Sequence, residues 1–363
     1  MNVAGVDAHV RNSYVQISRP DGQVLKKGRC SNTLADLLAF LSGLDRQEPL
    51  RVCLESTTNS RAIARLWQQA GRQADLPVQV DVLNARKLRP IAESVCKNDQ
   101  IDSDVLCQLG RSNFKLPACY MPDDEVFALR EHLRARADLV VIRTMLKNRV
   151  HAVLHRRGIL PPAAGIFTRS GQVWLSQLTL DAAGRQILDR YRAQIASIDT
   201  AIAESTRSLR ELARHARWAR PASLLQTMPG IGLITALTIL AELGDLSRFA
   251  SRAAVANYAG LVPILRESNG KRWLGPITHR GPHLLRQVLT EAAWVAIGRV
   301  PAYGALYHRI YDKKGSGKAI VAVARRMLED GFTLLKKDQE FRFVAAGGSH
   351  SQDSRKAVES VAG

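Results

Sequence analysis

The spacing of hydrophobic and polar residues over the first 120 positions indicates strands that alternate with helices. Strands are expected in three short apolar runs, at residues 2–6, 51–54 and 78–83. Two further segments of alternating polarity are joined by the Pro20-Asp21-Gly22 turn and predict a hairpin. Helical spacing of apolar residues covers 34–44 and 60–73. We therefore expect a mixed sheet flanked by helices in this part of the chain.

Beyond Pro122 the pattern is helical, with two long segments on either side of a turn region at 158–184. The second segment has apolar residues at alternating steps of four and three, with Ser205 in one seam position; they are Tyr191, Ile195, Ile198, Ile202, Leu209 and Leu212. This spacing is typical of an antiparallel or intermolecular coiled coil. A plain helical bundle fits the same pattern equally well.

A third helical region begins at Pro221 and contains the sequence PGIG at 229–232 between two helical patterns. Such a turn resembles a helix-hairpin-helix, in which exposed glycine amides can hold a phosphate. The tail after Phe343 is rich in Ala, Gly and Ser and is predicted to be disordered. We therefore expect four segments, at 1–120, 121–220, 221–343 and 344–363.

The charge of the chain favours nucleic acid as a partner. Its 52 basic and 33 acidic residues give a formal net charge of +19, spread over most of the length. A field of this sign attracts polyanions, with an anionic membrane as the weaker alternative. The sequence has no run of about 20 apolar residues and no signal-type segment, so we expect a cytoplasmic protein without a membrane anchor. Five cysteines without a close CxxC pair argue against a disulfide framework and a zinc ribbon.

Four acidic residues stand where they can meet. Asp7 follows the apolar run VAGV and Glu55 follows RVCL, so each is expected at the carboxyl edge of a buried strand. Asp99 and Asp102, in the stretch KNDQIDSD, share one face if the segment is helical. Grouped carboxylates repel one another, so protons or divalent cations must compensate them. Oxygen ligands favour Mg²⁺ or Mn²⁺, and two such ions about 4 Å apart support phosphodiester cleavage.

Each of these residues also has a simpler interpretation. A single acid at a strand end or helix start is often only a cap. Lys97 can contact the scissile phosphate or neutralise the acids, and ordinary solvation explains it equally well. His9, two residues after Asp7, is expected as a polar neighbour that lines the crevice, and a role as a ligand is the alternative. The complete set of four acids, in three separate segments, is the observation that favours a metal site.

The acids occur in the stretches GVDAH at 5–9, CLEST at 53–57 and KNDQID at 97–102. Together with FASRAAVANYAGLVP at 249–263 and ESNGKRWLGPITHRGPHLLRQVLTEAAW at 267–294, they resemble the DEDD-type insertion-sequence transposases, the insertion-sequence one-ten family, and the related pilin-gene invertases. The resemblance implies an α/β plus all-α chain. Its parts are a RuvC-like, ribonuclease-H-type mixed-sheet domain, a helical coiled-coil insertion used for dimerisation, and a helical C-terminal transposase domain.

The resemblance also implies roles for individual residues. The family's metal-binding D, E, D and D fall on Asp7, Glu55, Asp99 and Asp102. A family serine falls on Ser268 and implies a covalent phosphoserine intermediate, with Asn269 here in place of the usual glycine. Without the resemblance, RESNGK is a polar segment in which Asn-Gly predicts a tight reversal. With the resemblance, Thr278 is the reserve candidate for the nucleophile. Basic residues that suit a nucleic-acid backbone crowd the same region: Lys271, Arg272, His279, Arg280 and Arg286.

The partners implied by the family are double-stranded DNA, as donor and target, and a structured non-coding guide RNA, the bridge RNA, that pairs with both. A bacterial, nucleoid-associated dimer or tetramer with a composite site across protomers is expected. Two other functions remain open. One is a structure-selective nuclease or junction resolvase that cuts with water and does not use Ser268. The other is a catalytically silent nucleic-acid-binding protein.

Overall fold

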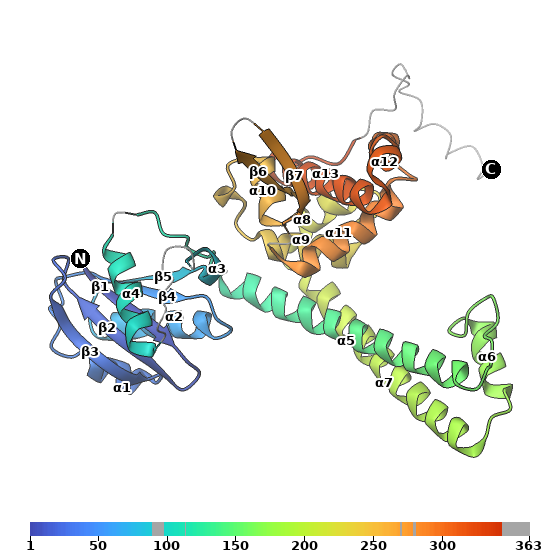
Figure 1. The fold of residues 1–363 in the computed structure, drawn as a ribbon, viewed down its shortest axis with the longest axis horizontal. Coiled ribbons are helices and arrows are strands. Elements are labelled where there is room, and N and C mark those ends of the chain that lie inside the picture. The colour runs from blue at the N-terminus through green and yellow to red at the C-terminus, as the bar shows by residue number, and fades with distance from the viewer. Residues whose placement is uncertain (89–97, 113, 269–270, 279–280, 343–363) are drawn as a thin grey trace, which may run out of the picture. The chain divides into compact units, whose positions relative to one another are not determined.

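The computed structural model describes residues 1–88, 98–112, 114–268, 271–278 and 281–342 of the chain. Two compact units are present, Met1–Pro122 and Asp123–Gly363 (Figure 1). Within the described residues, no helix combines the length and the apolar character needed to cross a bilayer.

The first unit contains a five-stranded mixed sheet in the order β3-β2-β1-β4-β5. Its strands are β1 (Asn2–Ala8), β2 (Asn12–Ser18), β3 (Val24–Ser31), β4 (Leu50–Glu55) and β5 (Val78–Leu83). β1, β2 and β3 pair antiparallel, whereas β4 lies parallel to both β1 and β5. The expected mixed sheet is therefore confirmed, and its strands follow the apolar runs of the sequence to within two residues at each end.

Helices cover both faces of this sheet (Figure 1). Helices α1 (Leu34–Leu41) and α2 (Ser60–Gln73) pack on one face, where side chains such as Val6, Leu54 and Trp67 share a core. The short α3 (Ala85–Leu88) follows β5, and α4 (Asp99–Arg111) packs on the other face, mainly against β1. A Cβ at Gly5 would collide with the backbone carbonyl of Ser103, so glycine allows α4 to lie directly on β1.

The second unit begins with two long helices, α5 (Asp124–His155) and α7 (Ala182–Leu212), with α6 (Arg169–Gln177) between them. Contacts between the long helices run in reverse order along the chain: Arg136 to Thr206, Arg143 to Asp199 and Arg157 to Asp181. The pair is therefore antiparallel, and α5 of the same chain covers the apolar seam of α7 (Figure 1). Two of the expected helices are confirmed, and the coiled-coil form stays a prediction.

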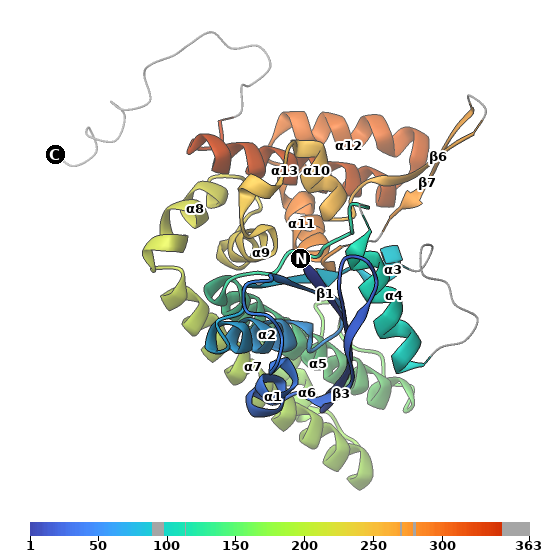
Figure 2. The ribbon, with the colours of Figure 1, turned by 90° about the vertical axis from the view of Figure 1, so that its left-hand side faces the viewer.

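A helical body completes the second unit. It consists of α8 (Ala216–Gln226), α9 (Leu233–Leu243), the 3₁₀ turn η1 (Leu246–Arg248), α10 (Arg252–Tyr258), α11 (His283–Ala296), α12 (Pro301–Lys314) and α13 (Ser316–Lys337). α13 is central, because α8, α10, α11 and α12 all pack against it (Figure 2). One core holds these helices together with the start of α5 and the end of α7.

A buried arginine connects α5 to this body. The Arg130 guanidinium donates from Nε to the carbonyl of Ala241 (2.8 Å) and from Nη2 to the carbonyl of Glu242 (3.0 Å). Its Nε also lies 3.6 Å from the Glu242 carboxylate, whose side chain is 4% exposed. Arg134 reaches the same carboxylate at 3.2 Å. Arg130 therefore satisfies carbonyls at the C-terminal end of α9 and compensates a buried charge.

The expectation of an all-helical C-terminal domain is wrong for one segment. Residues 263–277 form a β-hairpin of β6 (Pro263–Ser268) and β7 (Lys271–Ile277), which stands out from the helices (Figure 2). The only signal for the reversal in the sequence was the Asn-Gly dipeptide, which is typical of two-residue hairpin loops. Ile264 and Trp273 remain 36% and 55% exposed, so the strands lack the apolar alternation of a buried sheet.

Candidate active site

Two acidic residues project from the carboxyl edge of the sheet in the first unit. The parallel register pairs Gly5 with Cys53 and Val6 with Leu54, so Asp7 and Glu55 are the next residues of the two strands. Cys53 packs on the α4 face of the sheet, and side chains alternate along a strand. Asp7 and Glu55 are therefore directed to the face that α4 covers.

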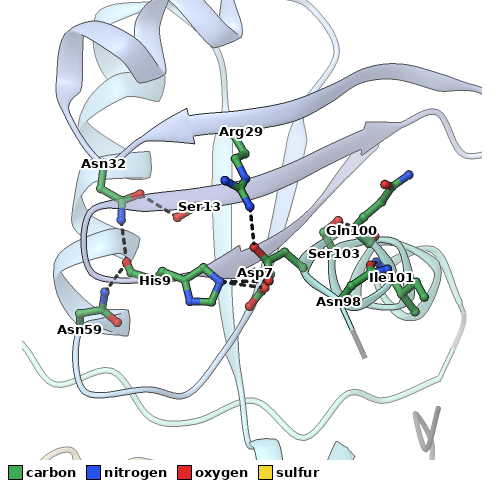
Figure 3. A network of polar contacts seen from close by, with 11 residues as sticks. Asp7, His9, Ser13, Arg29, Asn32, Asn59, Asn98, Gln100, Ile101 and Ser103 are labelled. Atoms are coloured by element: carbon green, nitrogen blue, oxygen red, sulfur yellow. Dashed lines mark hydrogen bonds and ion pairs between the residues drawn. The ribbon is translucent and has the colours of Figure 1, made fainter. Parts of the chain in front are cut away.

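The other two acids lie in the first turn of α4. Asn98 caps this helix, because its side-chain oxygen accepts a hydrogen bond from the Ile101 amide at 2.8 Å (Figure 3). Asp99 and Asp102 follow at spacing that puts both on one side of the helix. Acidic residues are common in the first turn of a helix, because the N-terminal end of a helix stabilises negative charge.

His9 brings the strand acid and the helix acid together. Its Nε2 lies 3.3 Å from Oδ2 of Asp7 and 3.5 Å from Oδ1 of Asp99. Figure 3 shows the His9 ring directed toward Asp7. One ligand atom from each of these three residues fits within 4.8 Å of the others. Arg29, on β3, approaches the second oxygen of Asp99 at 3.5 Å. The group is half open to solvent, with side-chain exposures of 23% for Asp7, 50% for His9 and 38% for Asp99.

Two asparagines hold the backbone of His9. The side-chain amides of Asn32 and Asn59 both donate to the His9 carbonyl at 2.8 Å (Figure 3). Asn59 stands at the N-cap position of α2, yet its side chain makes no cap hydrogen bond there. Its amide is instead oriented by Thr57, whose hydroxyl donates to Asn59 Oδ1 at 2.7 Å. The loop after β1 is therefore fixed from two sides.

The electrostatics of the cluster favour a cation. The pKa of the Asp7 carboxyl is raised, first by burial and then by the negative charges of Asp99 and Asp102, while His9 opposes the shift. An unpaired carboxylate is therefore costly at this place. Carboxylate oxygens are ligands for Mg²⁺ and Mn²⁺, and a divalent cation would offset the repulsion that raises the Asp7 pKa. The donor set therefore fits a divalent metal ion.

The structure brings some of the expected residues together and not others. Asp7 and Asp99 meet through His9, and Asp102 is near enough to raise the pKa of Asp7. Glu55 lies at the same sheet edge but outside the group of three ligand residues. His9 was expected to line the crevice, with a ligand role as the alternative, and it lies in the group of three possible ligand residues. Arg29 carried no signal, because only the sheet pairing brings β3 to the site.

The expected serine lies in the second unit. Ser268 is the last residue of β6 and pairs with Lys271 across the hairpin. For Ser268, Lys271 and Arg272 the described part of the structure covers the backbone only. Three other expected residues, Lys97, His279 and Arg280, lie outside the described residues, as does Asn269.

Two expected residues near the hairpin have described side chains. The Thr278 hydroxyl is buried and makes no hydrogen bond within the described residues. The Arg286 guanidinium donates from Nη1 to the carbonyls of Ala259 (3.2 Å) and Gly281 (2.9 Å), and burial lowers its pKa. Arg286 therefore ties α10 to the segment before α11, and its expected contact with nucleic acid stays a prediction.

Two family models match the chain. The IS110 DEDD transposase model covers residues 4–158, which include all four acids of the candidate metal site. The model of the transposase IS116/IS110/IS902 family covers residues 222–309, which include the hairpin and Ser268. The two matches therefore cover both regions from which candidate site residues were derived.

Curated relatives agree with these models. The chain is 28% identical over 302 residues to the transposase for insertion sequence element IS1328 of Yersinia enterocolitica, covering 83% of this chain and 85% of the relative. It is 24% identical to the transposase for IS1111A of Coxiella burnetii, covering 77% of each. It is 34% identical to the pilin gene-inverting protein of Moraxella bovis, over 33% of this chain and 38% of the relative. The chain therefore belongs to the IS110 family of DEDD transposases, enzymes that cut and join DNA.

Proposed function

We propose that this transposase excises and inserts its own insertion sequence by metal-dependent cleavage, a covalent phosphoserine intermediate and guidance by a structured RNA. The observation that carries the metal-dependent part is the meeting of Asp7 and Asp99 around His9, from a strand and a helix far apart in the sequence. The serine and RNA parts rest on the family resemblance of the second unit. The formal charge of +19 suits both nucleic-acid partners.

The sheet of the first unit supports a RuvC-like, ribonuclease-H-type assignment. Three antiparallel strands are followed by two parallel strands, and the acids emerge from the central strands β1 and β4. Asp7, Glu55, Asp99 and Asp102 are the proposed ligands of Mg²⁺ or Mn²⁺, with two ions in the site. Bound ions would stabilise charge on the phosphate and lower the pKa of the attacking hydroxyl. His9 orients Asp7 and Asp99, and Lys97 neutralises the substrate phosphate.

Ser268 is the proposed nucleophile. Its hydroxyl oxygen forms an ester bond to the phosphorus, the bond from phosphorus to one deoxyribose oxygen breaks, and the serine proton passes to the leaving oxygen through solvent. Attack by a new strand-end hydroxyl reverses the step and regenerates serine. Since the phosphodiester energy is kept, joining needs no ATP. Lys271, Arg272, His279 and Arg280 are proposed contacts to the nucleic-acid backbone.

The distribution of the candidate groups over two units supports an oligomer. The acids belong to Met1–Pro122 and Ser268 belongs to Asp123–Gly363. A composite site formed by two protomers, as a dimer or a tetramer, unites them in the proposal. The long helices α5 and α7 are the proposed means of association. Guide RNA then supplies most of the sequence choice by pairing with donor and target DNA.

A second candidate function is a metal-dependent nuclease or junction resolvase in which water attacks the phosphodiester. One observation favours it: the acid cluster lies wholly in the first unit, so it needs no residue of the second unit to bind metal. In this function Ser268 is inert. The two candidates therefore differ in a covalent protein–DNA adduct.

Adduct trapping tests the proposal. The full chain, its copurified RNA and Mg²⁺ are incubated with nicked element-end DNA that prevents rejoining, and adducts are mapped by mass spectrometry. The expected result is a phosphoester on Ser268 that disappears in Ser268→Ala. Ser170→Ala, which changes an exposed serine outside the hairpin, should leave the adduct intact. Cleavage without any adduct, unaffected by Ser268→Ala, would establish the nuclease instead.

A second experiment tests the guide RNA. RNA that copurifies with the chain is sequenced, and its loops are compared with the element ends and the insertion site. Changing the loop bases should redirect insertion to a site that matches the changed loop. Insertion at the original site with the changed RNA, or full activity after nuclease treatment removes all RNA, would refute guidance.

A further inference from the structure

Three aromatic side chains form a connected group on the helical body of the second unit. Trp294 lies near the end of α11, and Tyr307 and Tyr311 lie one turn apart on α12. The rings of Trp294 and Tyr307 are 5.7 Å apart, and those of Tyr307 and Tyr311 are 5.6 Å apart and nearly parallel, at 23°. We call Trp294, Val295, Tyr307 and Tyr311 the aromatic face.

The outer members of the aromatic face are open to solvent. Trp294 is 49% exposed, Val295 48% and Tyr311 47%, whereas Tyr307 is only 8% exposed. The buried Tyr307 ring therefore supports two large exposed rings and holds them in place. A protein leaves such rings in water at a cost in free energy, and a connected exposed group of them marks a surface that binds a partner.

Two cations lie close to these rings along the chain. Arg299 follows α11, and Lys314 lies three residues after Tyr311 on α12. Neither Arg299 nor Lys314 forms an ion pair within the described residues, in contrast to Arg325 and Arg326 on α13, which pair with acids one turn away. Two acids are also close along the chain: Glu291, which accepts a hydrogen bond from Gln287, and Asp312, which follows Tyr311. The unpaired cations suit a partner of negative charge.

The glycine turn between α8 and α9 adjoins the same face. Gly230 has a φ of +89°, and a Cβ at this residue would collide with the Ala292 carbonyl and lie 3.3 Å from Val295 Cβ. The turn therefore packs directly on α11 beside Val295. Gly232, at the start of α9, has open space where a side chain would stand. Exposed backbone thus borders the aromatic face.

We propose that the aromatic face binds unpaired nucleotides of a nucleic-acid strand, with bases on Trp294 and Tyr311 and phosphates near Arg299 and Lys314. Exposed aromatic rings next to cations are the combination that single strands require, because each unpaired base offers a flat face and each phosphate a charge. Bases inside a duplex are already stacked and do not reach such rings. The inference deepens the proposed function, because strand exchange and an RNA guide both expose unpaired bases.

Binding of short labelled oligonucleotides tests the proposal on the full chain. Fluorescence anisotropy is measured with oligodeoxythymidine, oligouridine and a blunt DNA duplex of equal length. Trp294→Ala and Tyr311→Ala should each weaken binding of the unpaired strands by roughly 5- to 150-fold. Duplex affinity should change little. The difference between the DNA and RNA arms identifies which unpaired strand the face prefers.

Matched variants make the result specific. Trp294→Phe keeps a ring and should restore most of the affinity, whereas Phe114→Ala removes an exposed ring of the other unit and should have no effect. Lys314→Gln should lower the salt dependence of binding by about 0.7 in the slope of log K against log salt. Thiouridine cross-links should map to Trp294 or Tyr311. Melting curves verify that each variant folds.

Several outcomes would overturn the inference. Unchanged affinity of Trp294→Ala, or cross-links only at other surfaces, excludes base stacking here. A shift in oligomeric state with unchanged affinity would assign the face to a second copy of the chain. These measurements do not depend on Ser268. A chain that forms no adduct on Ser268 but binds unpaired strands through the aromatic face would refute the proposed nucleophile alone, and the reverse result would refute the aromatic face alone.

Discussion

Replacement of Arg130 by methionine tests the connection between α5 and the helical body. Methionine keeps the aliphatic part of the side chain but removes the guanidinium that contacts the Ala241 and Glu242 carbonyls and lies 3.6 Å from the Glu242 carboxylate. Glu242 then remains 4% exposed, with Arg134 as its ion-pair partner at 3.2 Å. We expect the second unit to lose stability while the first unit is unaffected.

The magnitude follows from the groups left behind. Removal of one partner from a buried ion pair costs about 3–5 kcal/mol. The remaining contact of Glu242 with Arg134 places the expected loss near the lower end, at about 3 kcal/mol. For a unit of more than 200 residues, each kcal/mol lowers the melting temperature by about 2–4 °C, so a decrease of roughly 6–12 °C is expected.

Scanning calorimetry of the full chain measures this effect, because a change confined to one unit moves only its own transition. Arg134→Met is the matched control: Arg134 is 48% exposed, so its loss should cost less than about 1 kcal/mol. The double variant Arg130→Met, Glu242→Gln should lose at least about 1 kcal/mol less than the sum of the single changes. A cost for Arg130→Met equal to that of Arg134→Met, or additive costs in the double variant, would refute the reasoning.

Three further predictions concern the first unit and the tip of the long helices. Gly5→Ala should destabilise the first unit by about 1–3 kcal/mol, because the new Cβ pushes α4 away from β1. Metal binding, measured by calorimetry, should weaken as well, and unchanged binding would show that α4 has room to adjust. Asp7→Asn should stabilise the metal-free first unit at pH 7, because a carboxyl with a raised pKa destabilises the fold when it ionises as the pH rises. Relative to the parent, the melting temperature of this variant should be higher in EDTA and lower in Mg²⁺. The hydrogen bond from Arg157 lowers the pKa of Asp181 to about 2. The stability that this pair contributes is therefore present above about pH 4 and is lost as the pH falls toward 2. Asp181→Asn should remove this loss of stability at acid pH, and an unchanged decrease in melting temperature between about pH 4 and 2 would contradict the assignment.

The buried strands of the first unit were predictable because each consists of a short apolar run in the sequence. β5 falls at 78–83 as expected, and the acids at the ends of β1 and β4 could be derived because parallel strands share a carboxyl edge. The hairpin at 263–277 was missed because its two strands do not alternate clearly between apolar and polar residues, and the side chains of Ile264 and Trp273 are exposed. Local pattern carries information about a strand only where one face of it is buried.

In the candidate site, too, some residues were predictable from local sequence pattern and others were not. Asp7 and Asp99 follow from strand and helix ends, which sequence pattern locates. The contributions of Arg29, Asn32 and Asn59 depend on how β3, the loop before α1 and the start of α2 are arranged in space. No periodicity encodes such a meeting. The acids and His9 were therefore predictable from the sequence, whereas Arg29, Asn32 and Asn59 were not.

The two asparagine side chains on the His9 carbonyl have a consequence for protein engineering. Transfer of the GVDAH segment alone to another scaffold would move the acid without the amides that orient its neighbour. A functional graft needs three loops at once, together with a glycine at the point where α4 crosses the sheet. The acidic edge is therefore a property of the assembled unit, and shuffling between distant relatives should succeed only when these loops are exchanged as a set.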